Sequence, residues 1–304
     1  MTFSVTILGS GAALPTLQRF PTAQTVKVDE QIYLIDCAEG IQMQLRRYKV
    51  KFQQIRVIFI SHLHGDHVFG LPGLLSSLSM LERGEPLDIF GPPNVEEWLS
   101  GHLKFFTPLG FPLQFHKLTA KEQELIYEDQ RMTVTCFPLK HRIPTFGYLF
   151  REKEKLLNIR KDMIDFYQIP LRNIPGIKAG ADFDTGSGKL IANAQLTYPP
   201  AKQHSYAYCS DTVYFDGLSQ IVKDVDLLYH EATFGNDGKQ RAKETCHSTA
   251  EDAARVALDA NVGKLVIGHF SSRYKDITPL LEEARSIFPN TEAAEDGQRL
   301  MVYG

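Results

Sequence analysis

One seven-residue segment restricts the possible folds of this chain more than any other. Residues 61–67 read Ser-His-Leu-His-Gly-Asp-His and directly follow an apolar run, Arg56 to Ile60, that predicts a strand. Neutral imidazoles and a carboxylate suit zinc or a similar divalent ion, and Gly65 allows a tight turn, so this loop can face a pair of metal ions. The spacing differs from His-Glu-x-x-His, in which both histidines lie on one helix.

A loop with four ligands cannot complete the coordination shells of two metal ions. The fold must therefore place further His or Asp residues from other strand ends beside this loop. The sequence offers three. His141 follows a predicted strand that ends near Phe137, Asp211 follows the strand Ser205 to Ser210, and His269 follows Lys264 to Gly268. We expect these side chains to meet the first loop at one edge of the fold.

The remaining pattern predicts a mixed α/β protein in which helices cover the sheets. The clearest helix is Ser248 to Ala260, where Ser248 and Glu251 form a Ser-x-x-Glu capping box. Other predicted helices are Glu39 to Tyr48, Gly73 to Leu81 and Asp276 to Ile287. The predicted strands are Phe3 to Leu8, Ile32 to Asp36, Arg56 to Ser61, Leu87 to Phe90, Met132 to Phe137, Ser205 to Ser210, Val225 to His230, Lys264 to Gly268 and Arg299 to Tyr303.

Composition excludes several classes of protein. With 304 residues, 43% hydrophobic and 23% charged, the chain can bury a core and is neither disordered nor fibrous. It has no apolar run of about 18 residues and no basic N-terminal region before Arg19, so we expect a cytoplasmic protein without a membrane partner. The net charge of −3 (33 − 36) argues against a generally basic surface that coats nucleic acid but allows a local patch.

Residues 151–200 interrupt the pattern. Polar runs together with Pro170, Pro175 and several glycines replace clean periodicity, which suggests an inserted arm. Between Arg151 and Lys178 there are seven Lys or Arg and four Asp or Glu, a local charge of +3. From charge alone, a solvated, mobile loop is the simpler interpretation.

The motifs together resemble the ribonuclease Z family of the metallo-β-lactamase superfamily, and the resemblance covers essentially the whole chain. The loop of residues 61–67, His141, Asp211 and residues 268–273 (Gly-His-Phe-Ser-Ser-Arg) fit the superfamily. Residues 230–233 (His-Glu-Ala-Thr), residues 247–249 (His-Ser-Thr) and the opening Leu8 to Pro15 narrow the match. The fold this implies is the αββα sandwich, with two mixed β-sheets face to face and helices outside, in one catalytic domain over residues 1–304.

The resemblance also implies an activity, the endonucleolytic removal of the 3′ trailer from precursor tRNA. Metal-bound hydroxide would attack the phosphodiester, leaving a 3′-hydroxyl on the tRNA and a 5′-phosphate on the trailer. Asp66 would orient or deprotonate the water, His247 would protonate the leaving oxygen, and Glu231 would hold His247 in the right tautomer. The resemblance implies two zinc ions per subunit, with Mn²⁺ or another divalent ion possible. The first ion would be held by His62, His64 and His141, and the second by Asp66, His67 and His269. Asp211 would bind both ions.

By the same resemblance, residues 151–200 correspond to a flexible exosite that grips the tRNA elbow from the partner subunit of a homodimer. A duplex elbow offers phosphates and 2′-hydroxyls, so we expect Pro175, Gly176 and Lys178 to contact RNA, with Arg273 as a further substrate contact; no DNA partner is expected. Arg46, Arg47, Lys49 and Lys51 form a second possible phosphate patch, or simply a solvated helix face.

Two alternatives stay open at this point. The chain could keep the metals and act as a general phosphodiesterase or another small-molecule hydrolase of the superfamily. It could also be a protein without catalytic activity that binds RNA or stores metal on a hydrolase scaffold. Loss of turnover on replacing Asp66, with the fold preserved, would favour an enzyme over the second alternative.

Overall fold

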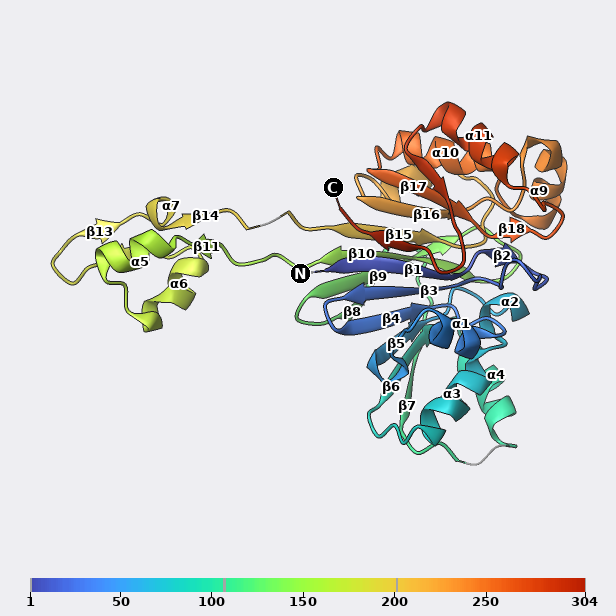
Figure 1. Cartoon of the computed structure of the whole chain (residues 1–304), viewed down its shortest axis with the longest axis horizontal. Coiled ribbons are helices and arrows are strands. Elements are labelled where there is room, and N and C mark those ends of the chain that lie inside the picture. The colour runs from blue at the N-terminus through green and yellow to red at the C-terminus, as the bar shows by residue number, and fades with distance from the viewer. Residues whose placement is uncertain (1, 106–107, 201, 304) are drawn as a thin grey trace. The chain divides into compact units, whose positions relative to one another are not determined.

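Two mixed sheets face each other at the centre of the fold (Figure 1). The computed structural model describes residues 2–105, 108–200 and 202–303. The chain divides into two compact units: Met1–Arg151 with His204–Gly304, and Glu152–Gln203. The first unit contains both sheets and their covering helices.

The first sheet has the strand order β20-β1-β3-β4-β5-β6-β7. Its neighbours β4, β5, β6 and β7 run parallel, whereas β20, β1, β3 and β4 pair antiparallel. The bounds are β1 Phe3–Gly9, β3 Ala23–Val28, β4 Gln31–Ile35, β5 Ile55–Phe59, β6 Leu87–Gly91, β7 Leu113–Lys117 and β20 Arg299–Met301.

The second sheet has the order β19-β17-β16-β15-β10-β9-β8. Strands β15, β16, β17 and β19 run parallel, so their carboxyl ends lie at one edge. The bounds are β8 Glu124–Glu128, β9 Met132–Leu139, β10 Thr145–Glu152, β15 Ser205–Cys209, β16 Leu227–Glu231, β17 Lys264–Gly268 and β19 Thr291–Ala293. A short parallel pair, β2 (Gly11–Ala12) with β18 (Phe270–Ser271), lies outside both sheets.

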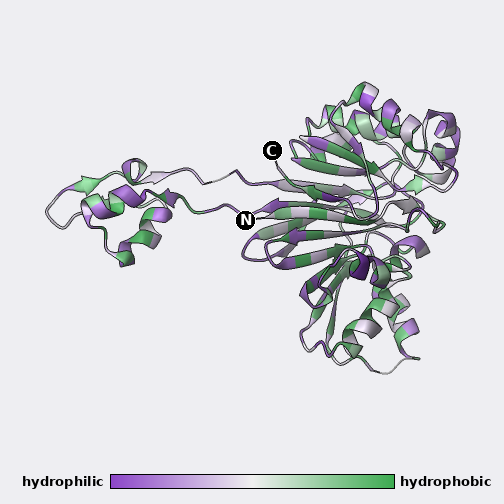
Figure 2. Ribbon diagram, viewed as in Figure 1, coloured by the Kyte–Doolittle hydropathy of each residue, from purple (hydrophilic) through white to green (hydrophobic). Residues whose placement is uncertain are grey.

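Helices cover the outer face of each sheet. Three clusters of buried apolar side chains hold the layers together. The first lies between the sheets and includes Val5, Phe59 and Tyr148. The second lies between the second sheet and helices α10 and α11, and the third between the first sheet and helices α1, α3 and α4. Figure 2 shows the hydrophobic residues along the strands. The predicted αββα sandwich is therefore confirmed. The helices of this unit are α1 Ile41–Arg47, α2 Gly65–Val68, α3 Leu71–Met80, α4 Val95–Leu103, α8 Leu218–Ile221, α9 Lys239–Thr245, α10 Ala250–Asp259 and α11 Thr278–Ile287.

Helix α10 begins one residue later than its capping-box prediction implied. The observed N-cap is Thr249, whose hydroxyl accepts from the Asp252 amide, while the Asp252 carboxylate accepts from the Thr249 amide. The predicted pair of Ser248 and Glu251 is wrong, because the Ser248 hydroxyl instead donates to the Thr212 carbonyl, 2.6 Å away. The predicted pair and the observed pair both consist of a hydroxyl residue followed three positions later by an acid, so the sequence alone does not distinguish them.

The second unit, Glu152–Gln203, has its own small core. Five buried apolar side chains form it, from Ile169, Ile177, Phe183, Ile191 and Leu196. Interpreting this segment as a solvated loop is therefore wrong, because it contains regular elements packed on one another. They are β11 Asn158–Ile159, α5 Lys161–Tyr167, α6 Ile174–Lys178, β12 Phe183–Asp184, β13 Leu190–Ile191, α7 Asn193–Leu196 and β14 Thr197–Tyr198.

Membrane-spanning helices are not found among the described residues, since none of the helices there is both long and apolar enough to cross a bilayer.

Candidate metal centre

The loop after β5 and the short helix α2 that follows it contribute the first candidate ligands of the site. His62 is fully buried, His64 is the N-cap of α2, and Asp66 and His67 lie in that short helix. Gly65 does not make the tight turn that its place in the motif suggested. It is the first residue of α2, and a Cβ there would lie 2.1 Å from the mostly exposed Phe69 ring, so a larger residue would displace that ring.

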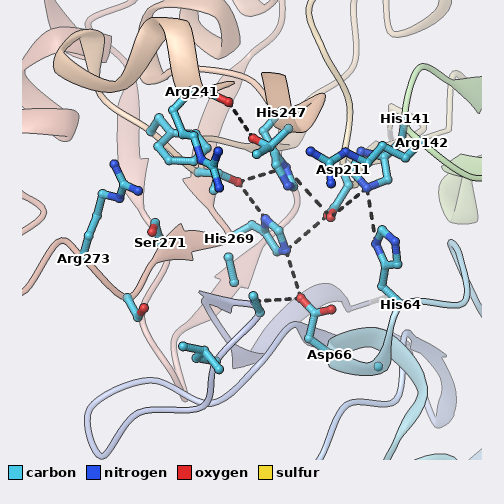
Figure 3. A pocket seen from close by; sticks show the side chains of 18 of the residues that line it. His64, Asp66, His141, Arg142, Asp211, Arg241, His247, His269, Ser271 and Arg273 are labelled. Atoms are coloured by element: carbon cyan, nitrogen blue, oxygen red, sulfur yellow. Dashed lines mark hydrogen bonds and ion pairs between the residues drawn. The ribbon is translucent and has the colours of Figure 1, made fainter. Parts of the chain in front are cut away.

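Three other strand ends reach the same place, as the sequence predicted. His141 follows β9, Asp211 follows β15 and His269 follows β17. Their side chains converge with His64 and Asp66 on one cavity (Figure 3). Strand ends of an open α/β fold commonly converge in this way, which is why residues far apart in sequence meet here.

The first group of donors is His62, His64, His141 and Asp211. His64 Nδ1 lies 3.0 Å from His62 Nε2 and 3.3 Å from His141 Nε2. Asp211 Oδ2 completes the group, 3.5 Å from His62 Nε2 and 3.8 Å from His141 Nε2.

The second group is Asp66, His67 and His269, joined by the other oxygen of Asp211. Asp66 Oδ2 lies 3.5 Å from Nε2 of both His67 and His269. Asp211 Oδ1 lies 3.4 Å from His67 Nε2 and 3.2 Å from His269 Nε2. One carboxylate therefore faces both groups, with a different oxygen toward each.

These separations fit divalent ions. A tetrahedral zinc site with metal–nitrogen distances of about 2.0–2.1 Å places its ligand atoms about 3.3–3.4 Å apart. The separations within both groups lie around that value. In addition, His67 Nε2 and His269 Nε2 are buried and have no hydrogen-bond partner within the described ranges, as metal-facing nitrogens would.

In His141 and His269, the ring nitrogen that faces away from the centre is held by a hydrogen bond, which fixes the nitrogen that faces the centre. His141 Nδ1 donates to the Cys246 carbonyl at 2.8 Å. His269 Nδ1 donates to the Thr233 hydroxyl at 2.8 Å, and that hydroxyl donates to Glu231 at 2.7 Å.

Asp36 anchors the first loop and was not singled out from the sequence. Its buried carboxylate accepts from His67 Nδ1, the Tyr208 hydroxyl and the Ser61 hydroxyl, each at 2.8 Å, and from the Ser61 amide at 2.7 Å. Asp36 directly follows β4. The strand-end rule that identified Asp211 could therefore have found it.

His247 lies beside the two groups. Its Nδ1 donates to Glu231 Oε1 at 2.9 Å and lies 3.9 Å from Asp211 Oδ2. Glu231 is fully buried, and its carboxylate also accepts from the amides of Thr212, Ser248 and Thr233, each at 3.0 Å. This network fixes the His247 ring with Nδ1 protonated.

Burial and the neighbouring charges shift the pKa values of several site residues in opposite directions. Burial raises the pKa of Asp66, but His67 and His269 outweigh it and keep that pKa well below its ordinary value. Burial lowers the pKa of His62 and so favours the neutral imidazole that a metal needs. Burial also lowers the pKa of His247, but the Glu231 carboxylate outweighs it and raises that pKa to about 9.

The N-terminal loop closes one side of the site. The Ala13 amide donates to Asp66 Oδ2 at 2.8 Å. Asp296 ties both ends of this loop, because its carboxylate accepts from the Ser10 amide at 2.9 Å and from the Phe20 amide at 2.8 Å. These contacts depend on tertiary structure, and no local sequence signal indicates them.

The site opens into a cavity of about 550 Å³. Three arginines, Arg142, Arg241 and Arg273, line it together with the candidate ligands (Figure 3). Of these, the sequence singled out only Arg273. The other expected substrate residues, Pro175, Gly176 and Lys178, lie on α6 of the second unit, with Pro175 and Gly176 exposed.

Comparison with known proteins gives matches across the chain. The family described as anti-Pycsar protein Apyc1 matches residues 3–158. The crystal structure of human tRNase Z, short form, superposes with a TM-score of 0.72 at 27% identity, covering 99% of each chain.

Relatives found by sequence have a higher identity to this chain than the human structure has. Ribonuclease Z of Bacteroides thetaiotaomicron is 48% identical, covering 99% of this chain and 95% of its own length. Ribonuclease Z of Parabacteroides distasonis is 49% identical over 301 residues, which cover 99% of each chain. With about half of its residues identical to these relatives over nearly its full length, the chain belongs to the ribonuclease Z family.

Proposed function

We propose that this protein is a metal-dependent endoribonuclease that removes the 3′ trailer from precursor tRNA. The products would be a tRNA with a 3′-hydroxyl and a trailer with a 5′-phosphate. The observation that carries the proposal is the pair of donor groups joined by Asp211 at the base of a cavity lined by arginines. Family membership supports the substrate, since relatives that share almost the whole chain are ribonuclease Z proteins.

Two divalent ions fit the donor groups, and we propose zinc for both, with Mn²⁺ as another candidate. His62, His64 and His141 would hold the first ion, Asp66, His67 and His269 the second, and Asp211 both. When bound, such a pair supplies Lewis-acid chemistry to a phosphodiester and lowers the pKa of water. Neutral imidazoles and carboxylates are the ligands that zinc prefers in hydrolases.

Asp66 and His247 would carry out the proton transfers of the reaction. Asp66 is fixed by the Ala13 amide, so its carboxylate is oriented to accept a hydrogen bond from an attacking water. His247 gives Nδ1–H to Glu231, which leaves Nε2 to donate a proton to the leaving oxygen of the tRNA. Glu231 acts through His247 and is therefore a positioning residue. Arg142, Arg241 and Arg273 would bind the phosphates on either side of the cut.

The second unit, residues 152–203, would bind the tRNA at a distance from the cut. Helix α6 presents Pro175 and Gly176 at its surface and Lys178 in its last turn, a combination of backbone and charge that suits phosphates and 2′-hydroxyls. A homodimer, in which each unit of this kind serves the partner's site, stays a prediction. Met43 on α1 and Met80 on α3 are mostly exposed apolar side chains, and their burial between two subunits would be a direct sign of it. A cytoplasmic location also stays a prediction.

The test is cleavage of a precursor tRNA with an extended trailer. Purified protein is assayed as prepared, after chelation, and after zinc is added back, and both new ends are mapped. We expect one metal-dependent cut that leaves a 3′-hydroxyl on the tRNA. Asp66→Ala should abolish the cut while keeping the fold, whereas Asp88→Ala, which alters a partly buried His116–Asp88 pair, should not abolish it.

A general phosphodiesterase is the alternative this experiment can establish. Zinc-loaded protein that hydrolyses a simple phosphodiester but leaves precursor tRNA intact would support it. Replacing residues 152–203 by a short linker separates the two further. The proposed nuclease should lose precursor cleavage and keep small-substrate hydrolysis, whereas equal loss of both would contradict the tRNA-binding role of that unit.

A further inference from the structure

A second polar cavity lies in the first unit, on the outer face of the first sheet. Strand β1 alternates there, so that Val5 belongs to the core between the sheets while Ser4 and Thr6 face the other way. In the register of the sheet, Ser4 lies opposite Lys27 on β3, and Thr6 lies between Thr25 on β3 and Arg299 on β20. Strand pairing therefore places two hydroxyl and two cationic side chains around Ser4 on one surface.

The segment after α1 forms the opposite wall. It contributes Tyr48, Lys49, Val50 and Lys51, and together with the sheet it encloses a cavity of about 240 Å³. A phosphate group fits easily in that volume. The full lining is Ser4, Thr6, Thr25, Lys27, Ile32, Tyr48, Lys49, Val50, Lys51, Gln54, Gly297 and Arg299.

Positive charge is concentrated here although the chain as a whole is acidic. Lys27, Lys49, Lys51 and Arg299 line the cavity, and none of the described residues that line it carries a carboxylate. One acid, Glu30, contacts two of the lining residues: its mostly exposed carboxylate lies 3.7 Å from Lys27 Nζ and accepts from Gln54 Nε2 at 3.4 Å. A small anion would therefore meet four cations and little competing negative charge.

The floor of the cavity supplies an independent observation. Ser4 is only 1% exposed, and its hydroxyl is buried without a hydrogen-bond partner in the described part of the chain. Leaving such a group unpaired costs free energy, so a partner is expected in the functional state. An anion held by the surrounding cations would accept that hydrogen bond.

We propose that this cavity binds a phosphate group. Lys27 and Arg299 would hold its oxygens from the sheet, Lys49 and Lys51 from the opposite wall, and Ser4 would donate from the floor. The site is separate from the metal centre. Five residue steps along β1, about 17 Å, lie between Ser4 and Gly9, where the strand leads into the loop that carries Ala13 to Asp66. The phosphate could come from a free anion or from the backbone of bound RNA. Only the second source rests on the proposed function.

Threonine methyl NMR locates phosphate binding directly. The full-length protein, labelled at threonine methyls, is titrated with inorganic phosphate at low ionic strength. We expect the Thr6 and Thr25 signals to move together, while Thr233, beside His269, reports separately on the metal cavity.

Three variants test the assignment. Lys27→Gln/Arg299→Gln should weaken the phosphate response of Thr6 and Thr25 by about tenfold, since two charge-assisted contacts are lost. Ser4→Ala keeps all four charges and should weaken it by a smaller factor. Lys121→Gln/Lys223→Gln changes the net charge equally but outside the cavity, and should leave the response unchanged.

Binding of uncleaved precursor tRNA identifies the source of the phosphate. If the cavity holds an RNA phosphate, Lys27→Gln/Arg299→Gln should weaken RNA binding and reduce the slope of log affinity against log salt by about 2. If RNA binding is unchanged while the phosphate response is lost, the ligand is a free phosphoryl anion. An absent phosphate response at Thr6 and Thr25, together with equal RNA affinity in all variants, would overturn the proposal even if tRNA cleavage is established.

Discussion

Replacing Asp36 by Asn tests whether the loop of residues 61–67 is preorganised for metal. The substitution keeps shape and removes one acceptor. One Asp36 oxygen accepts the Ser61 amide, and the other accepts the Ser61 hydroxyl, the Tyr208 hydroxyl and His67 Nδ1. If the amide NH₂ takes the first position, it faces the Ser61 N–H as a second donor. If it takes the other, it forces His67 Nδ1 to become an acceptor.

In the second case the proton of His67 moves to Nε2, the nitrogen that lies 3.4 Å from Asp211 and faces the second donor group. That nitrogen can then no longer bind a metal ion. Losses of such supporting hydrogen bonds reduce metal affinity by about 10- to 100-fold, equivalent to about 1.4–2.7 kcal/mol. We expect a loss in this range at the site built by Asp66, His67 and His269, with the site of His62, His64 and His141 less affected.

Competition between the protein and a chromophoric zinc chelator measures both affinities. The control is Asp88→Asn, the same substitution in the partly buried His116–Asp88 pair, where the separation is 2.6 Å but no candidate metal donor is involved. Asp36→Asn protein that retains its fold and binds two zinc ions as tightly as the control would refute this reasoning.

Three further outcomes are expected. Thr249→Ala removes the side-chain half of the observed capping box and should lower the free energy of unfolding by about 1 kcal/mol in urea denaturation, whereas Glu251→Ala, which removes surface ion pairs, should cost about 0.5 kcal/mol or less. Leu196→Ala empties the core of the second unit and should destabilise that unit by about 2–5 kcal/mol, seen as faster hydrogen exchange within residues 152–203 at unchanged zinc content. Glu231→Gln should slow precursor cleavage by about 100-fold while zinc stoichiometry stays at the parent value, and a parent-like rate would exclude the positioning role.

The candidate metal donors could be located from the sequence because their chemistry limits them to a few residue types. Few side chains bind zinc, and those at strand ends can meet even when, like His64 and His269, they lie about two hundred residues apart. The strands that carry them are apolar and therefore conspicuous. Strand β3 was missed for the opposite reason, because Gln24, Thr25 and Lys27 interrupt its apolar pattern. Gln24 is nevertheless buried, since its side chain accepts a hydrogen bond from the Tyr206 hydroxyl of the second sheet.

Features that depend on tertiary contacts were beyond sequence reasoning. The core of the second unit draws Ile169, Ile177, Phe183 and Leu196 from irregular spacings, so no helical or strand period reveals it. Arg241 reaches the metal cavity from α9, which itself carries none of the motifs found in the sequence. The Ala13 contact uses a backbone amide, which every residue except proline possesses and no sequence pattern can distinguish.

The Asp296 clamp sets the order in which the site can be completed during synthesis. Residues 10–20 leave the ribosome early, but their two ends are joined by a carboxylate made almost three hundred residues later. Until then this clamp cannot hold Ala13 against Asp66, although the loop of residues 61–67 already exists. Because Asp296 also follows His269 in the chain, the candidate metal centre and its N-terminal wall are complete only once synthesis has passed residue 296.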